Sequence, residues 1–189
     1  MGNQTALLVM DMQLAVMGRL TDADLVLVNT VRAIDHARER GILVVFVKVD
    51  FRMGGPEISL ANKIFAPSKI HTSNPQMSKM MEISPALGQR LDDIVVAKKR
   101  VSAFSGSDLE ILLRSQGIQD LVLCGVSSSG VVLSTLREAA DRDYSITVLS
   151  DCCGDADQAL KVVLEEKVFP MQATVSNLSD WILANSSPI

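Results

Sequence analysis

Short, unbroken runs of apolar residues recur along the chain, separated by stretches with helical spacing. Continuous runs of this kind, as opposed to alternating ones, are typical of strands that are buried on both faces of a parallel sheet. The runs occupy residues 7–10, 42–47, 94–97, 121–124 and 146–149, with a weaker one at 173–175. The pattern therefore predicts a parallel sheet of about six strands.

Apolar residues at helical spacing lie between these runs and predict four amphipathic helices. Their stripes are formed by Leu27, Val31, Ile34 and Ala37; by Leu109, Leu112 and Leu113; by Val132, Leu136, Ala139 and Ala140; and by Leu160, Val163, Leu164 and Val168. Gly41 and Gly117 predict the ends of the first two helices, and Ser107 with Glu110 has the spacing of a capping box. The alternation of strands and helices predicts an α/β fold, a doubly wound sheet with helices on both faces.

Residues 50–93 do not fit the short connections that are usual in a compact domain. They contain Gly54, Gly55 and four prolines, and they show little periodicity. Connections this long are usually lids, binding loops or contact arms, and we call this segment the arm. Because 189 residues are enough for one α/β domain and show no internal repeat, we expect a single domain over residues 1–189 that includes the arm.

Composition and charge narrow the choice of partners. The chain is 48% hydrophobic with a formal charge of −4 and a pI of about 5.2, which argues against a general nucleic-acid binder or a binder of anionic membranes. No apolar run approaches the roughly 20 residues of a membrane helix, and residues 1–5 lack the basic region of a signal peptide. These features predict a cytoplasmic protein that acts on a small molecule.

Three cysteines, Cys124, Cys152 and Cys153, form a sparse set without a Cys-x-x-Cys pair. This number and spacing exclude a disulfide framework and an all-cysteine zinc site, and they fit the reducing cytosol. The hypothesis that one of the three cysteines is a reactive thiol stays open at this point.

Four charged residues and one glycine follow the first five predicted strands, and they are Asp11, Asp50, Lys98, Gly125 and Asp151 in chain order. Ligands bind to open α/β sheets beyond the ends of such strands. A carboxylate and an ammonium that converge there would form an acid/base pair with mutually shifted pKa values. The alternative interpretation is that Asp11 caps the next turn and that Lys98 is a solvated charge.

A turn rich in small residues follows the fourth strand, and we call residues 125–131, Gly-Val-Ser-Ser-Ser-Gly-Val, the elbow. Backbone N–H groups at the start of the next helix would favour an anion there, as an oxyanion hole or a carboxylate pocket. The glycine spacing matches neither a dinucleotide-binding fingerprint nor a phosphate loop. The alternative is an ordinary serine-capped helix.

Three stretches in this order resemble the isochorismatase-like hydrolases, also called cysteine hydrolases. They are Leu-Leu-Val-Met-Asp-Met-Gln at 7–13, Val-Val-Ala-Lys at 95–98 with Ser-Ala-Phe-Ser-Gly-Ser-Asp-Leu at 102–109, and residues 123–139 around the elbow. The resemblance covers nearly the whole chain in its order of elements. It implies a three-layer α/β/α sandwich, in agreement with the apolar pattern.

The resemblance also implies roles for individual residues. Asp11 is the expected general acid/base, with Lys98 as its cationic partner. A cis peptide bond is expected between Val126 and Ser127, and the backbone N–H groups of Ser127 and Val131 are the expected oxyanion donors. Phe104 would lie near the substrate or serve only as a core residue.

One departure from the family pattern concerns the nucleophile. The family has a cysteine at the position that Val131 occupies here. Cys124 lies seven residues upstream in an apolar strand, and Cys152 and Cys153 follow the fifth strand, so all three are expected to be structural.

Three hypotheses follow from the missing thiol. The protein hydrolyses a vinyl (enol) ether by protonation from Asp11, as true isochorismatases do without this cysteine, or it keeps the pocket for binding only, or it cleaves an amide with Ser128 or Ser129. The last is the weakest, because neither His36 nor His71 is placed as an obvious base.

A metal, a cofactor and a nicotinamidase activity are not expected. Relatives that act on nicotinamide carry an Asp-x-His pair after the second strand, whereas this chain has Asp50-Phe51-Arg52 and only two histidines in all. Relatives commonly form dimers or tetramers, so a homo-oligomer with the arm as a contact is expected.

Overall fold

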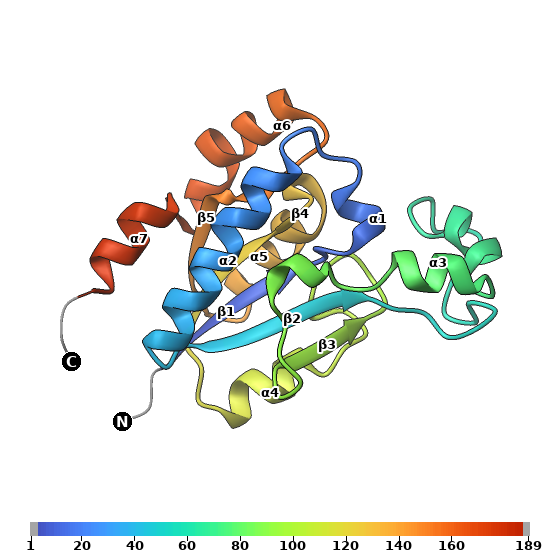
Figure 1. Cartoon of the computed structure of the whole chain (residues 1–189), viewed down its shortest axis with the longest axis horizontal. Helices are drawn as coiled ribbons and strands as arrows, with labels where there is room; N and C mark the ends of the chain where they lie inside the picture. Colours follow the sequence, from blue (N-terminus) through green and yellow to red (C-terminus); the bar gives the residue numbers. More distant parts are fainter. Residues whose placement is uncertain (1–3, 187–189) are drawn as a thin grey trace.

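Six parallel strands form the central sheet, and helices cover both of its faces (Figure 1). The computed structural model describes residues 4–186. The strands are β1 (Thr5–Met10), β2 (Leu43–Val49), β3 (Ile94–Lys98), β4 (Asp120–Val126), β5 (Ser145–Gly154) and β6 (Thr174–Ser176). Their order across the sheet is β3-β2-β1-β4-β5-β6, and every neighbouring pair is parallel. The predicted α/β sandwich is confirmed.

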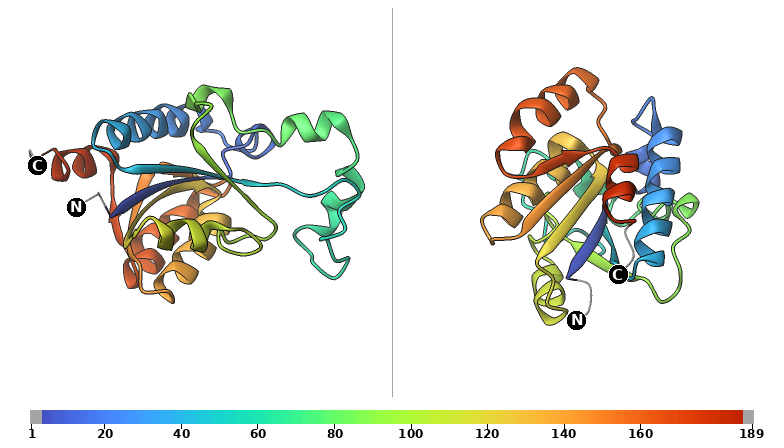
Figure 2. Two further views of the ribbon diagram at one scale, coloured as in Figure 1. Left: turned by 90° about the horizontal axis from the view of Figure 1, so that it is seen from below. Right: turned by 90° about the vertical axis from the view of Figure 1, so that its left-hand side faces the viewer.

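The helices divide into two layers. Helices α1 (Leu14–Met17), α2 (Ala23–Glu39) and α7 (Leu178–Ala184) cover one face, and α4 (Leu109–Ser115) and α5 (Leu133–Ala140) cover the other. The right view of Figure 2 shows the layers on either side of the twisted sheet. Residues of β1 alternate between the two cores, with Leu7 in one and Leu8 in the other, which explains why this strand reads as a continuous apolar run.

The chain reverses its direction across the sheet next to β1. It passes from β1 to β2 and β3 on one side, and then returns to β4, β5 and β6 on the other. Met10, the last residue of β1, is paired with Gly125 of β4. The residue after β1 and the elbow after β4 therefore lie at the topological switch point, where open α/β sheets bind ligands.

The arm leaves the carboxyl end of β2 and extends away from the sheet (Figure 1). It contains the 3₁₀ turns η1 (Ala66–His71) and η2 (Pro85–Leu87) and the short helix α3 (Pro75–Met80). A small apolar cluster around Val49, Ile58 and Phe65 forms its own core. The buried Gln13 amide joins the arm to the sheet, because Nε2 donates to the carbonyls of Val49 and Met81 while Oε1 accepts from the Val49 N–H.

Three expected strand ends were placed too early. Lys98 is the last residue of β3, Gly125 lies inside β4 and Asp151 lies inside β5, because these strands continue beyond their apolar runs. Small residues and cysteines form the last part of β5, so hydrophobicity alone does not mark its end. The Asp151 carboxylate accepts the N–H of Leu178 at 2.8 Å and so fixes the start of α7.

The expected capping box does not form its reciprocal pair. Ser107 Oγ accepts the Leu109 N–H at 3.3 Å, but the Glu110 carboxylate pairs with Arg114 and accepts a bond from the Tyr144 hydroxyl. Helix α4 begins at Leu109, one residue later than a capping box from Ser107 requires.

The fourth expected helix differs most from its prediction. It is divided into α6 (Gln158–Val163) and the π-helical turn η4 (Leu164–Val168). Leu164 is buried, but Leu160 and Val163 of the predicted core stripe are 40% and 51% exposed. The predicted stripe is therefore only partly covered.

Residues 1–3, which contribute to the signal-peptide prediction, lie outside the described residues. Among residues 4–186, no helix combines the length and the apolar character needed to cross a membrane.

Substitution of Gly125 tests how closely the backbones of β1 and β4 approach each other at the switch point. A Cβ atom at this position would lie 2.5 Å from the Met10 carbonyl oxygen, a backbone atom that cannot move aside alone. We expect Gly125→Ala to lower the free energy of unfolding by at least about 2 kcal/mol, measured by chemical denaturation.

Gly18→Ala is the matched control. Its Cβ would make an ordinary contact of 3.4 Å with the Leu14 carbonyl oxygen, and its φ of −63° suits alanine. We expect a change within about 0.5 kcal/mol, and equal effects of the two substitutions would contradict the close approach.

Candidate active site

Asp11 and Lys98 form a buried ion pair at the carboxyl edge of the sheet. Asp11 is the first residue after β1 and has a φ of +55°, while Lys98 is the last residue of β3. The Lys98 side chain passes over the end of β2, which separates the two strands, and places Nζ 2.8 Å from Asp11 Oδ2. The structure therefore brings together the two charges that the sequence separates by 87 positions.

The Lys98 ammonium has an acceptor for each of its three protons. Besides Asp11 Oδ2, it donates to the carbonyl oxygens of Arg100 at 3.0 Å and Val101 at 2.8 Å. The side chain is fully buried, so Lys98 is not a solvated charge.

Burial sets the protonation of this pair. Loss of solvation raises the pKa of the Asp11 carboxyl from 3.8 to about 6, although the Lys98 charge opposes the rise. Burial lowers the pKa of Lys98, and the Asp11 carboxylate opposes that shift. Asp11 Oδ1 is buried and has no hydrogen-bond partner among the described residues. Close to neutral pH, a proton that binds to the Asp11 carboxylate can therefore be carried by Oδ1.

The elbow lies directly beyond the neighbouring strand β4. The Val126–Ser127 peptide bond is cis, at the position that the family resemblance implies, and the π-helical turn η3 (Ser128–Val132) leads into α5. Ser127 occupies the N-cap position without a side-chain capping bond, so the elbow is not an ordinary serine-capped helix. The role of the Ser127 and Val131 N–H groups as oxyanion donors stays a prediction.

Asp155 fixes the elbow and was missed by the sequence analysis. This carboxylate is buried and accepts the Ser129 N–H at 2.8 Å through Oδ2 and the Asp157 N–H at 3.2 Å through Oδ1. It is the first residue after β5, so it would have stood among the strand-end residues had the end of β5 been placed correctly.

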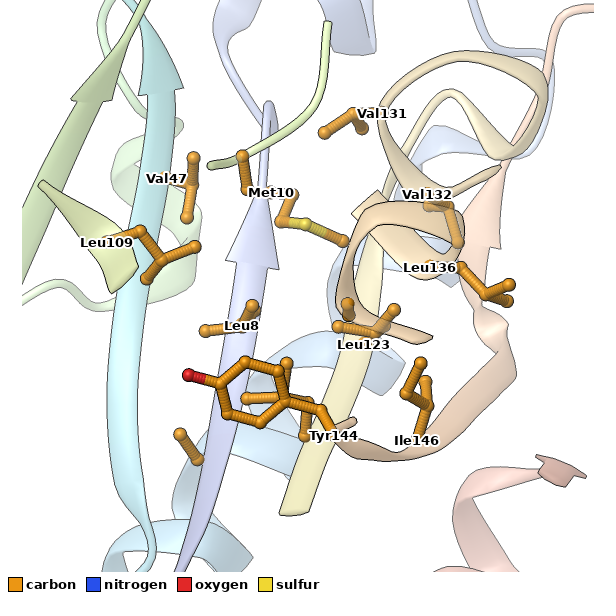
Figure 3. Close-up of a cluster of buried hydrophobic side chains, with 14 of the residues drawn as sticks. Leu8, Met10, Val47, Leu109, Leu123, Val131, Val132, Leu136, Tyr144 and Ile146 are labelled. Carbon is orange, nitrogen blue, oxygen red and sulfur yellow. The ribbon is translucent and has the colours of Figure 1, made fainter. Parts of the chain in front are cut away.

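The family resemblance predicts the nucleophile at the position of Val131, whose side chain is apolar. It is buried in the same cluster as Met10 and Ala103. Figure 3 shows Val131 extending from the elbow toward the end of β1, above Met10. A methyl-bearing side chain therefore stands at this position of the elbow.

Phe104 belongs to this cluster as well, and its ring also contacts Tyr144 and Arg142. It stacks on Tyr144 with ring centroids 6.0 Å apart, and the Arg142 guanidinium lies 5.0 Å from the ring centre. A core role is therefore evident, while a contact between Phe104 and substrate stays a prediction.

The three cysteines are buried, free thiols. Burial raises the pKa of each thiol, to about 12 for Cys153, which keeps them protonated and unreactive. Their expected structural role agrees with these environments.

The histidines lie away from the elbow. His36 packs edge-on against Trp181 between α2 and α7, and His71 ends η1 in the arm. Among residues 4–186, no group of three or more His, Cys, Asp or Glu side chains is arranged to hold a metal ion.

Comparisons with known proteins agree with this geometry. The family model for the isochorismatase domain matches residues 5–180. The ureidoacrylate amidohydrolase RutB of Variovorax paradoxus is 31% identical over 93% of this chain and 80% of its own length. A probable inactive nicotinamidase of Arabidopsis thaliana is 27% identical over 80% of this chain and 81% of its own.

A solved structure gives the same result. An isochorismatase family protein from Burkholderia thailandensis superposes with a TM-score of 0.89 and 28% identity, covering 98% of this chain and 97% of the other.

The pairing of Asp11 with Lys98 predicts a pKa change that can be measured. In Lys98→Met the positive charge is lost, and we expect the pKa of Asp11 to rise by about one unit or more above its value near 6. Carbon-13 NMR titration of the Asp11 carboxyl group measures this change.

Lys48→Met is the control, because Lys48 pairs with the exposed Asp50 at 3.5 Å and not with Asp11. An Asp11 pKa that is unchanged in Lys98→Met, or that moves equally in both variants, would be inconsistent with the assigned pair.

Proposed function

Because the chain belongs to the isochorismatase family, we propose that it hydrolyses an enol (vinyl) ether or a related small carboxylate, with Asp11 as the acid. One observation supports this choice above the others. Lys98 holds one oxygen of the Asp11 carboxyl group, while the other is buried, has no hydrogen-bond partner among residues 4–186 and can present a proton. This group has the character of a general acid with a pKa of about 6.

The proposed reaction needs no nucleophilic side chain. Asp11 gives its proton to the terminal carbon of the enol ether, and the electron pair of the double bond forms the new C–H bond. Water adds to the resulting oxocarbenium ion and returns a proton to Asp11. The hemiketal then breaks its bond to the leaving alcohol, which gives a ketone and an alcohol.

The residues around Asp11 have separate tasks in this proposal. After Asp11 has given its proton to the substrate, the Lys98 ammonium pairs with the resulting carboxylate, which is therefore not an isolated buried charge. The N–H groups of Ser127 and Val131 bind the anionic group of the substrate at the start of the helix. Asp155 already occupies the Ser129 N–H, so that donor does not compete.

A second candidate is binding without turnover. The observation that favours it is Val131, whose apolar side chain fills the nucleophile position, together with a relative that is named a probable inactive nicotinamidase. Such a protein would retain the pocket for a small acid as a binding module.

Amide cleavage by a serine has less support. Ser128 is buried, and its hydroxyl is directed to the Gly154 carbonyl oxygen at 3.4 Å. The Ser129 N–H is bound to Asp155, and both histidines belong to other parts of the fold. Cytoplasmic location, a homo-oligomeric state and a single domain remain predictions beside this proposal.

The acid role of Asp11 predicts a pH profile. We expect kcat/KM for isochorismate or a related enol ether to be constant below a pH of about 6 and to fall about tenfold per pH unit above it, because only protonated Asp11 reacts. Asp11→Asn is expected to lower kcat/KM by at least about 100-fold.

Alkylation of thiols is the control in this experiment and should leave the rate unchanged, because the cysteines are buried and protonated. A rate that rises with pH through this range, or full activity in Asp11→Asn, would refute the acid role. Tight binding of a small acid without turnover would favour the binding module.

Val131→Cys tests whether the site is a cysteine hydrolase that has lost its nucleophile. We expect this variant to gain hydrolysis of an amide such as ureidoacrylate, the substrate in the name of the Variovorax relative, because a thiolate at the helix start is stabilised. The gain should disappear on thiol alkylation.

Val132→Cys places a thiol one residue further along and serves as the matched control, since Val132 is also buried. Equal activity of the two variants, or no gain in either, would count against Val131 as the nucleophile position.

A further inference from the structure

Two buried aspartates flank the elbow, and only one of them has a cation beside it. Among residues 4–186, Asp11 and Asp155 are the only acidic residues that are buried, at 7% and 4% exposure. Asp11 is paired with Lys98, whereas no basic side chain of the described residues forms a salt bridge with Asp155. Aspartate is seldom buried without a paired cation, so the position of Asp155 calls for a physical reason.

The sheet places Asp155 beside the elbow, on the side away from Asp11. Val126 of β4 is paired with Gly154 of β5. The residues that follow them, Ser127 and Asp155, therefore leave the same edge of the sheet. Strand β4 lies between β1 and β5, so Asp11 and Asp155 are two strand spacings apart, roughly 10 Å across the sheet. The elbow leaves β4 between the two carboxyl groups.

Backbone N–H groups bind the Asp155 carboxylate in place of a cation. Its Oδ2 accepts the Ser129 N–H at 2.8 Å, and its Oδ1 accepts the Asp157 N–H at 3.2 Å. Ser129 is two residues away from Ser127 and from Val131, which are the two expected donors to the ligand. The helix start at the elbow, which favours an anion, therefore already holds a negative charge that belongs to the protein.

A ligand with an anionic group would bring a second negative charge to the same helix start. Two like charges repel each other, and burial strengthens the repulsion because the surrounding dielectric constant is low. We propose that Asp155 is a specificity-determining residue, whose carboxylate weakens the binding of an anionic group at the elbow and leaves the binding of a neutral ligand unchanged. This inference rests on the proposed function in one point, that the elbow receives an anionic group.

A purely structural role of Asp155 predicts the opposite result. If its carboxylate only held the Ser129 N–H in place, its removal would loosen the elbow and weaken the binding of every ligand there. Removal of a repelling charge instead strengthens the binding of anions alone. The sign of the change in affinity, compared between an anion and a neutral ligand, therefore separates the two roles.

Asp155→Asn removes the charge with little change in size. The amide oxygen can still accept one of the two N–H groups that the carboxylate binds. We expect the dissociation constant of benzoate to fall by at least about threefold, and that of benzamide, a neutral ligand of similar shape, to change by less than about twofold. NMR titration followed at the backbone amide signals of Ser127 and Val131 measures both constants and shows whether the ligand binds at the elbow.

Asp151→Asn is the matched control. Asp151 also belongs to β5, and its carboxylate accepts the N–H of Leu178 at the start of α7. The substitution therefore removes the same charge from the same kind of contact, at a helix outside the elbow. Asp151 lies four residues before Asp155, roughly 13 Å along the strand, and is partly exposed, so we expect both dissociation constants to stay within about twofold of the wild type.

Asp155→Ser is a second variant, for the case that Asp155→Asn does not fold. It retains a hydroxyl acceptor without the charge, and the same tightening of benzoate binding is expected. Circular dichroism checks the folding of all three variants. If neither substitution of Asp155 yields a folded protein, the carboxylate is needed for the structure itself and the proposal is overturned.

Four results with folded variants would also overturn it. They are an unchanged or larger benzoate constant in Asp155→Asn, an equal change for benzamide, the same change in Asp151→Asn, and no response of the elbow amides to benzoate in the wild type. Hydrolysis of an enol ether is measured separately. Turnover together with benzoate binding that does not depend on Asp155 refutes only this inference, whereas the expected binding without turnover refutes only the proposed reaction.

Discussion

A buried ammonium group is the constraint on which the candidate site depends. Lys98 Nζ has no contact with solvent, so each of its protons needs an acceptor from the protein. Those acceptors come from Asp11 and from the carbonyls of Arg100 and Val101, which joins the end of β1 to the loop after β3. The Ala103 N–H of that loop then donates to Thr135 Oγ1 on α5, the helix that the elbow begins. The hydrogen bonds of Lys98 and of the loop after β3 thus link Asp11 to the helix that follows the elbow.

The absence of a thiol changes what this arrangement can do. In the family pattern that the sequence resembles, a cysteine at the helix start is expected to attack the substrate, with Asp11 and Lys98 in support. Under the proposed function Val131 stands in that place, and the chemistry left is proton transfer from Asp11, whose pKa of about 6 suits an acid near neutral pH. Enol ethers are reactive toward protonation and need no covalent intermediate, which is why they fit the residues that remain better than amides do.

The sequence patterns mispredicted two features, the burial of the fourth helix and the end of β5. The stripe of Leu160 and Val163 has the spacing of a core helix, but the described chain leaves both side chains partly exposed. Spacing shows which side chains share a face and not what lies opposite that face. The end of β5 was placed too early because the last residues of the strand are small and do not extend the apolar run. Asp155, the first residue after the strand, was missed for this reason.

The sequence by itself determined the order of elements, the parallel sheet and the residues at the ends of β1 and β3, because buried strands and amphipathic helices follow directly from the spacing of apolar residues. Through the family resemblance it also predicts that Val131 stands where a nucleophilic cysteine is expected. Only the tertiary structure decided that Lys98 is buried on Asp11, that one Asp11 oxygen has no partner in the described part of the chain, and that Asp155 fixes the elbow. These contacts join residues from different strands, so their distances depend on how the sheet is assembled and on no local pattern.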